Sequence, residues 1–410
     1  MTFEPDDLRE AGRALLDDAV ELRRELHRHP ELGLELPRTQ QAVLDRLADL
    51  DLDVRTGTTS TSVVADLVGD PDGPIVLLRG DMDALPMPED TELPFASEVR
   101  NTMHACGHDT HTAMLVGAAR LLADRRSELA GTVRFMFQPG EEGQFGARHM
   151  IDEGVLDGVG RAFGIHVTPN LPAGWVGTRP GPLLASADEF AITVRGRGGH
   201  ASTPHFANDP IPVACEIVSA LQTFVTRRVD VFAPGVISVT KVRAGTANNV
   251  IPETALLEGT VRAVSGRTRA AALEALERVA TNVAAAHDMV AEVTLHDGYP
   301  VTVNDAGRAA GTVETATRLL GADHVIELPT PVMGAEDFSY VLEEVPGAMA
   351  FLGMCPPGAN PGAAPPNHSN RMLIDEAPMA DGMALHAAMA LTGLAELVAG
   401  AGAADEASAS

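Results

Sequence analysis

Pro74-Ile-Val-Leu-Leu-Arg-Gly-Asp-Met-Asp83 is the stretch of sequence that decides the fold of this chain. Its short apolar run is typical of a strand that is buried on both faces of a parallel sheet, and it ends at two aspartates. Two further strands, predicted at residues 132–137 and 162–165, also end next to polar side chains. Because ligands bind at the carboxyl ends of strands in open α/β sheets, we expect the functional site at this edge.

Strands alternate with amphipathic helices in this part of the chain, which predicts a mainly parallel α/β domain. The helices are predicted at residues 6–27, 39–50 and 110–126. Near residue 185 the pattern changes to the alternation of apolar and polar residues that is typical of a half-exposed strand.

An α+β unit, with an antiparallel sheet and two helices, is predicted after this change. Its strands are expected at residues 189–196, 236–242, 254–264 and 290–296, and its helices at 211–227 and 268–287. We therefore expect an inserted domain at residues 185–297 and a first domain made of residues 1–184 and 298–400. Residues 401–410 are mostly small and polar and are predicted to be disordered.

Length and charge limit the class of protein. The 410 residues are too many for one hydrophobic core, so two domains are expected. A formal net charge of −27 argues against nucleic acid or an anionic membrane as a partner, since both are polyanions. Residues 1–13 are polar and acidic, and the 3 cysteines cannot all pair, so we expect a cytoplasmic protein without a membrane span.

The cluster His104-Ala-Cys-Gly-His-Asp109 is the strongest candidate for a metal site. Cys106 and His108 are separated by one residue, so both side chains can reach one centre. A thiolate and imidazoles suit zinc or another first-row transition ion. The alternative is a buried cysteine beside a helix-capping histidine, but a hydrophobic core does not tolerate so many ionisable groups without a purpose.

Polar residues after the other predicted strands add to this candidate site. In the pair Glu141-Glu142, one carboxylate could bind metal while the other transfers protons; an acidic loop is the alternative. His166 and His368 are candidate ligands. The alternative for His166 is a core histidine, and the alternative for His368 is a solvated loop histidine. Asp83 could cap a turn or orient a ligating imidazole.

Two residues of the predicted insert could stabilise a developing oxyanion. His200 follows a glycine-rich turn, and Asn249 is the second of two asparagines before Val250-Ile-Pro252. The alternative for both is a role in turns.

Nine motifs, in this order, resemble the M20 metallopeptidase family, and most closely the amidohydrolase branch that includes hippurate hydrolases, N-acyl-L-amino acid amidohydrolases and plant indole-acetyl-amino-acid hydrolases. The matching stretches are Leu26-His-Arg-His-Pro-Glu-Leu32, Arg79-Gly-Asp-Met-Asp-Ala-Leu-Pro86, Met103-His-Ala-Cys-Gly-His-Asp109, Gln138-Pro-Gly-Glu-Glu-Gly143, Gly164-Ile-His166, Gly198-Gly-His-Ala201, Asn249-Val-Ile-Pro252, Met333-Gly-Ala-Glu-Asp-Phe338 and Pro366-Asn-His-Ser369. Together they cover almost the whole chain.

The resemblance implies a mainly parallel-sheet metallohydrolase domain that binds two divalent cations, which could be zinc, manganese, cobalt or nickel. By similarity, Cys106 bridges both cations. Glu142 and His368 complete one site, and His108 and His166 complete the other. The inserted domain resembles the dimerisation or lid domain of the family, which implies a homodimer.

The resemblance also implies roles in catalysis. Glu141 would transfer protons, and Asp83 would orient the site. His200, from the same chain or from the partner subunit, and Asn249 would stabilise the tetrahedral oxyanion. Two further hypotheses concern the substrate: Arg262 would bind its carboxylate, and His205 would line its pocket.

The implied reaction is hydrolysis of the amide bond of small N-acyl amino acids, which releases a carboxylic acid and an amino acid. A dipeptidase or aminopeptidase is the alternative within the family, but peptidase branches carry a histidine where this chain has Asp81 and an aspartate where it has Cys106. A non-catalytic metal-binding protein on this fold is the alternative outside enzymes. It is disfavoured because the chain keeps Glu141 and every expected ligand.

Overall fold

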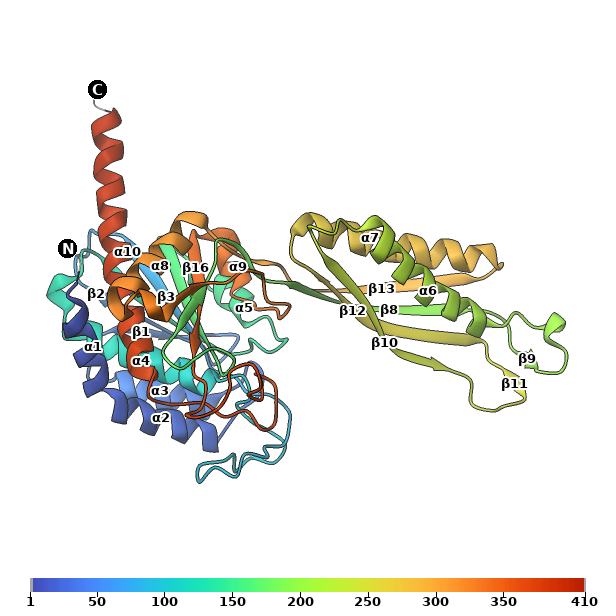
Figure 1. The fold of residues 1–410 in the computed structure, drawn as a ribbon, viewed down its shortest axis with the longest axis horizontal. Helices are drawn as coiled ribbons and strands as arrows, with labels where there is room; N and C mark the ends of the chain where they lie inside the picture. The colour runs from blue at the N-terminus through green and yellow to red at the C-terminus, as the bar shows by residue number, and fades with distance from the viewer. Residues whose placement is uncertain (1–2, 409–410) are drawn as a thin grey trace. The chain divides into compact units, whose positions relative to one another are not determined.

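The computed structural model describes residues 3–408, which form two units (Figure 1). The first unit comprises Met1–Leu183, Val303–Pro329 and Tyr340–Ser410, and the second comprises Leu184–Thr302 and Thr330–Ser339. The segment Thr330–Ser339 thus belongs to the second unit, whereas the sequence pattern places it in the first domain. Its backbone explains the difference, because Ala185 N–H donates to the carbonyl oxygens of Val332 and Gly334 at 3.0 and 2.9 Å.

An eight-stranded mixed sheet forms the centre of the first unit. Its order is β1 (Asp53–Thr56), β2 (Val63–Val68), β4 (Thr132–Gln138), β3 (Ile75–Asp81), β5 (Val159–Thr168), β16 (Gly347–Gly353), β6 (Val176–Thr178) and β15 (Val325–Glu327). The central strands β4, β3, β5 and β16 are all parallel. Every residue of β4 and β16 is buried, as expected for strands covered on both faces, which confirms the predicted fold class.

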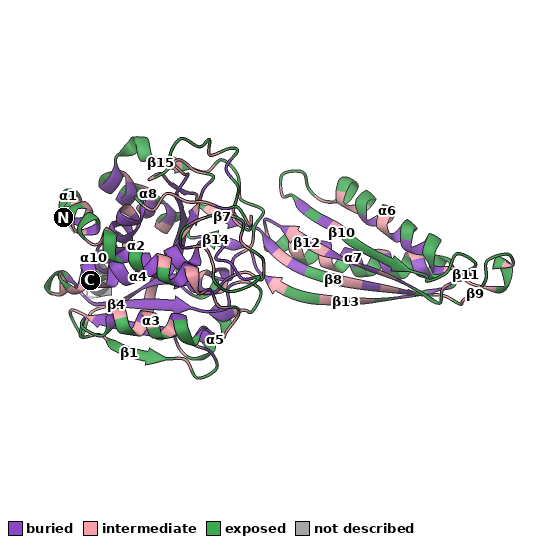
Figure 2. Cartoon of the chain, turned by 90° about the horizontal axis from the view of Figure 1, so that it is seen from below, coloured by how far each residue is buried: buried purple, intermediate pink, exposed green. Residues whose placement is uncertain are grey.

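The helices of the first unit pack on this sheet or on one another (Figure 2). They are α1 (Pro5–Ala14), α2 (Leu16–Arg28), α3 (Pro37–Leu47), α4 (His108–Ala123), α5 (Gly146–Asp152), α8 (Ala306–Leu320), α9 (Ser339–Glu344) and α10 (Met379–Ser408). Gly107 precedes α4 with a φ of +89°, and a Cβ atom there would lie 2.4 Å from Val167 Cγ2. Only glycine therefore fits between Cys106 and His108 without strain.

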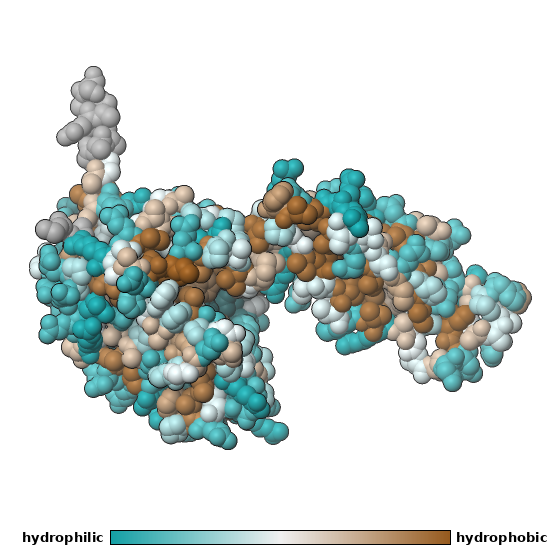
Figure 3. All heavy atoms as spheres, in the orientation of Figure 1, coloured by the Kyte–Doolittle hydropathy of each residue, from teal (hydrophilic) through white to brown (hydrophobic). Residues whose placement is uncertain are grey.

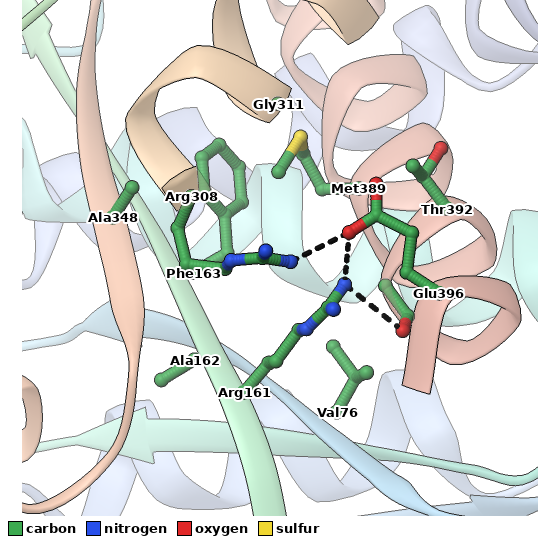
Figure 4. Close-up of a pocket in the computed structure, with 11 residues that line it drawn as sticks. Val76, Arg161, Ala162, Phe163, Arg308, Gly311, Ala348, Met389, Thr392 and Glu396 are labelled. Atoms are coloured by element: carbon green, nitrogen blue, oxygen red, sulfur yellow. Dashed lines mark hydrogen bonds and ion pairs between the residues drawn. The ribbon is translucent and has the colours of Figure 1, made fainter. Parts of the chain in front are cut away.

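Helix α10 is the core helix of the first unit. Residues Met379–Ala401 are long and apolar enough to cross a membrane by length and composition, but 61% of the most apolar window is buried inside the protein. Glu396 on α10 binds both Arg161 of β5 and Arg308 of α8 (Figure 4). The helix continues through Ser408, into the segment 401–410 for which the sequence predicts disorder.

The second unit is an antiparallel sheet with two helices, as predicted from the alternating pattern. The sheet order is β10 (Gly235–Ala244), β12 (Thr254–Ala263), β8 (Ser186–Arg195) and β13 (Val290–Tyr299), and the helices are α6 (Pro210–Arg228) and α7 (Gly266–Ala286). Buried and less buried residues alternate along β8, so one face packs on the helices through a core that includes Phe190, Ile217 and Leu276.

Shorter strand pairs complete the structure. In the second unit, β9 (Gly199–His200) pairs with β11 (Val250–Ile251). Strand β7 (Gly181–Leu184) pairs with β14 (Thr302–Asn304) where the chain leaves and re-enters the first unit.

The second unit also carries apolar side chains on its surface (Figure 3), among them Val231 and Phe232, which are 80% and 94% exposed.

Candidate active site

The candidate site lies at the carboxyl ends of the central parallel strands of the first unit. Strand β3 ends at Asp81, two residues before Asp83, and β4 ends three residues before Glu141. His166 lies near the end of β5. Helix α4 begins at His108, and the segment between β16 and α10 adds His368. The sheet thus gathers residues that are far apart in the sequence.

The structure brings together all of the predicted metal ligands. Their ligand atoms form two groups, each with its atoms within 4.8 Å of one another: Cys106, His108 and His166 in one, and Cys106, Glu142 and His368 in the other. Cys106 Sγ lies 3.4 Å from His166 Nε2, and His368 Nε2 lies 3.2 Å from Glu142 Oε1. Because Cys106 belongs to both groups, it occupies the position of a shared ligand.

Glu141 lies beside these groups without belonging to either. Its Oε2 atom is 4.0 Å from His108 Nε2, and the residue is only 5% exposed. A buried carboxylate next to a ligand group is suited to proton transfer.

Asp83 fixes the two glutamates and His108 together. Its carboxylate accepts hydrogen bonds from the backbone N–H groups of Glu141 and Glu142, each at 2.9 Å. Its backbone oxygen accepts a hydrogen bond of 2.8 Å from His108 Nδ1. Nδ1 is thereby the donor nitrogen, which leaves the Nε2 lone pair free to bind a cation.

The residues at this site fit divalent cations. His108 Nε2 is buried and finds no hydrogen-bond partner among residues 3–408. A buried polar atom without a partner is costly, and a bound cation would satisfy it. A thiol, three imidazoles and a carboxylate are ligands that suit zinc and other first-row ions.

Charge and burial shift the pKa values of these ligands. Burial opposes protonation of His108, but Asp81 and Cys106 outweigh it and raise the pKa of His108 well above its ordinary value. Burial raises the pKa of the Cys106 thiol and lowers the pKa of His166. Hydrogen bonds to Cys106 and Glu142 raise the pKa of His368 to about 10. Cation binding must displace the protons of these groups, so we expect it to weaken at low pH.

A network of buried hydrogen bonds that supports the proposed ligands was not predicted from the sequence. Arg79 Nη1 donates to Asp81 Oδ2 at 2.6 Å, and Asp81 Oδ1 accepts a 2.5 Å hydrogen bond from His111 Nδ1. His111 Nε2 in turn accepts the Val167 N–H at 2.8 Å. Both ring nitrogens of His111 are therefore occupied, so His111 supports the site instead of binding a cation. The signal was present in the sequence, since two charged residues at alternate positions of a buried strand need buried partners.

Asp109 also has partners other than a cation. Its Oδ2 atom lies 2.8 Å from Arg23 Nε and 2.8 Å from His27 Nδ1. His27 Nε2 lies 3.1 Å from Glu89 Oε1. His27 therefore joins α2 to the start of α4 and to residue 89.

His200 and Asn249 lie next to each other, in the second unit. Val250 is paired with His200 across β9 and β11, and Ala201 N–H donates to Asn249 O at 3.0 Å. His200 is exposed, and its Nδ1 lies 2.8 Å from Ser202 Oγ. Of the two substrate hypotheses, Arg262 lies in β12, and His205 is exposed in the segment after β9.

Comparison with known proteins gives consistent matches over most of the chain. The profile of peptidase family M20/M25/M40 matches residues 77–392. The N-acetylcysteine deacetylase of Bacillus subtilis is 43% identical over 84% of this chain and 90% of its own length. The IAA-amino acid hydrolase ILR1-like 4 of Arabidopsis thaliana is 39% identical over 93% and 87%. Among solved structures, the YXEP protein of Bacillus subtilis, a dinuclear metal-binding peptidase from the M20 family, matches with a TM-score of 0.81 and 37% identity, covering 93% of this chain and 98% of that one.

Proposed function

This chain belongs to peptidase family M20/M25/M40, and we propose that it hydrolyses the amide bond of N-acyl amino acids with two divalent cations, releasing a carboxylic acid and an amino acid. One observation carries the proposal. Cys106 is shared by two ligand groups, and the buried Glu141 carboxylate lies beside them, 4.0 Å from His108 Nε2. This arrangement suits a hydrolase that uses two cations.

The proposed ligands are Cys106, His108 and His166 for one cation and Cys106, Glu142 and His368 for the other. When bound, the cations supply Lewis acidity, which polarises the acyl carbonyl and lowers the pKa of water. Their identity is left open among zinc, manganese, cobalt and nickel, because these ligands suit all of them.

Glu141 performs the proton transfers in this proposal. Its carboxylate takes a proton from the water that attacks the acyl carbon, and the resulting carboxylic acid gives that proton to the amide nitrogen as the C–N bond breaks. Asp83 holds the carboxylate in place through the backbone of Glu141 and Glu142. His200 and Asn249 are proposed to donate hydrogen bonds to the developing oxyanion.

The relatives support an acyl amino acid as the substrate. Two of them are named for the removal of an acyl group from an amino acid, one as an N-acetylcysteine deacetylase and one as an IAA-amino acid hydrolase. The solved relative is described as a peptidase, so a dipeptidase or aminopeptidase is the second candidate.

A substrate panel with two variants tests the reaction. The protein, loaded with Zn²⁺, Mn²⁺, Co²⁺ or Ni²⁺, is assayed on hippurate, N-acetyl amino acids, indole-acetyl amino acids and dipeptides. Wild type, Glu141→Ala and the exposed control Glu35→Ala are compared. Turnover of acyl amino acids that is lost only in Glu141→Ala supports the proposal. Turnover of dipeptides alone replaces it with the peptidase, and no turnover despite bound cations identifies a non-catalytic metal-binding protein.

We also propose that the second unit joins two copies of the chain into a homodimer. The exposed Val231 and Phe232 side chains support this, because large apolar residues at a protein surface commonly mark contacts between proteins. Sedimentation of wild type and Phe232→Asp tests this proposal. If both proteins are dimers, the Val231 and Phe232 side chains do not form the dimer contact. If wild type is a monomer, the proposal of a homodimer is wrong.

The cytoplasm is the proposed location. All three cysteines, Cys106, Cys215 and Cys355, are free thiols in the structure, which suits a reducing compartment. Fractionation of the source cells with an antibody to this protein tests the proposal, and recovery outside the cytoplasmic fraction would contradict it.

A further inference from the structure

The segment that carries His368 has little structure of its own. Residues 354–378, between β16 and α10, form turns but neither helix nor strand. His368 has a φ of +68°, which is unfavourable for a residue with a side chain, and its side chain is 56% exposed. Contacts with the rest of the first unit must therefore hold this ligand in place.

Two neighbouring residues provide these contacts. His368 N–H donates to Ala105 O at 2.7 Å. The side-chain amide of Asn367 donates twice through Nδ2, to Cys106 O at 2.9 Å and to Val167 O at 3.1 Å. Val167 O also accepts a 2.8 Å hydrogen bond from His166 Nδ1.

Asn367 therefore joins three of the four segments that carry the proposed ligands, those of Cys106, His166 and His368. Its amide group donates hydrogen bonds to Cys106 O and to Val167 O, the carbonyl oxygen that also orients His166. His368 is the next residue in the chain and is linked to Asn367 covalently. An NH₂ group has two hydrogens at a fixed angle, so it can serve both carbonyl oxygens at once. A carboxylate of the same shape has no hydrogen to donate and would repel both oxygens.

We propose that Asn367 is the positioning residue that sets the distance between His368 and the other ligands. The inference rests on the proposed function, since it assumes that these residues bind two cations. Asn367 itself touches neither cation nor substrate. Its loss affects chiefly the group of Cys106, Glu142 and His368, because only His368 depends on this segment of the chain. The group of Cys106, His108 and His166 keeps its anchors on α4 and β5.

Asn170 provides a matched control for this proposal. Its Nδ2 atom also donates to two backbone carbonyls of the same segment, Pro361 O at 2.9 Å and Ala364 O at 3.1 Å. Neither carbonyl belongs to a proposed ligand or to a neighbour of one. Asn170→Ala therefore loosens the segment without releasing the ligands.

The test is titration of the cation-free full-length protein with Co²⁺, followed by calorimetry and by the visible absorption of the bound ion. Wild type should bind two Co²⁺ ions. In Asn367→Ala and Asn367→Asp, one ion should bind about 10–100-fold more weakly, as is typical when a residue that orients metal ligands is removed. The other ion, and the thiolate charge-transfer band, should remain. Asn170→Ala should bind both ions as wild type does.

Three outcomes would overturn the inference. They are unchanged binding of both ions in the Asn367 variants, an equal loss in Asn170→Ala, and wild-type binding in Asn367→Asp, which would mean that the amide hydrogens are not needed. Circular dichroism before titration shows whether each variant is folded. If Asn367→Ala does not fold, Asn367→Asp still allows the test, because aspartate keeps the volume of the asparagine side chain. Wild type that binds fewer than two ions would refute the proposed function itself, which separates the two failures.

Discussion

Gly107→Ala should destabilise the first unit strongly, because the new methyl group meets two separate obstacles. The φ of +89° at this position costs a residue with a side chain about 1–2 kcal/mol. The new Cβ would also lie 2.4 Å from Val167 Cγ2, and relieving such an overlap in a packed core costs about 1–3 kcal/mol. The two terms together predict a loss of about 2–5 kcal/mol in the free energy of unfolding.

Two further variants separate these terms. Gly143 has a φ of +78°, and no atom lies within 4 Å of the position that a Cβ atom would take there, so Gly143→Ala should lose only the cost of the backbone conformation. Val167→Ala removes the methyl group that Gly107→Ala would strike. In the double variant, Gly107→Ala should therefore cost about 1–3 kcal/mol less than it does alone.

The fluorescence of Trp175 measures this loss. It is the only tryptophan in the chain and lies in the first unit, so guanidinium unfolding followed by its emission reports on that unit alone. Equal stability losses in Gly107→Ala and Gly143→Ala, together with no favourable coupling to Val167→Ala, would refute the packing argument.

Three more predictions follow from the site and the core. Asp83→Asn should weaken cation binding by about 10–100-fold, because an amide cannot accept both backbone N–H groups that the carboxylate accepts; calorimetry would contradict this if affinity were unchanged. Burial lowers the pKa of His27, but hydrogen bonds to Asp109 and to a second carboxylate outweigh burial and raise this pKa. The protonated His27 side chain should therefore stabilise the fold fully below the unfolded pKa of about 6.5, and this stabilisation should be lost as pH rises through the folded pKa. The stability difference between wild type and His27→Gln should thus shrink in alkaline buffer, and a difference that is independent of pH would be the contrary result. Asp66→Ala removes the carboxylate that pairs with the buried Arg134 and should lower the free energy of unfolding by about 3–5 kcal/mol. Glu396→Ala removes a carboxylate whose side chain is 43% exposed and should lower it by about 1 kcal/mol or less. Denaturant unfolding that reversed this order would count against the distinction between buried and exposed pairs.

The sequence was sufficient to predict much of the fold and to choose side chains that the structure brings together in two groups. The short apolar run of β3 is consistent with a strand that is buried on both faces, and the alternation along β8 predicts a sheet with one solvated face. The proposed ligands could be chosen because Cys106 and His108 are separated by a single residue and the others lie in motifs that resemble those of the M20 family. These predictions depend on short-range patterns, which a single sequence displays directly.

The supporting residues could not be predicted in the same way. The roles of His111 and Asn367 depend on backbone N–H and C=O groups of Val167 and Cys106, and nothing in the sequence shows which backbone group a side chain will meet. The assignment of Thr330–Ser339 to the second unit depends on backbone hydrogen bonds to Ala185, which involve residues about 150 positions apart and leave no local pattern.

The order of the strands has a consequence for synthesis on the ribosome. Strand β5 is paired with β16, with Ala162 opposite Gly347, so the central sheet of the first unit lacks a member until Gly347–Gly353 has been synthesised. Residues 184–302 of the second unit are contiguous and leave the exit tunnel before β16 does. Since nascent domains fold as units in order of their emergence, the insert can acquire most of its structure while the first unit still waits with an open sheet edge. His368, the last of the proposed ligands along the sequence, emerges after β16, so the growing chain cannot bind both proposed cations until this segment has been made.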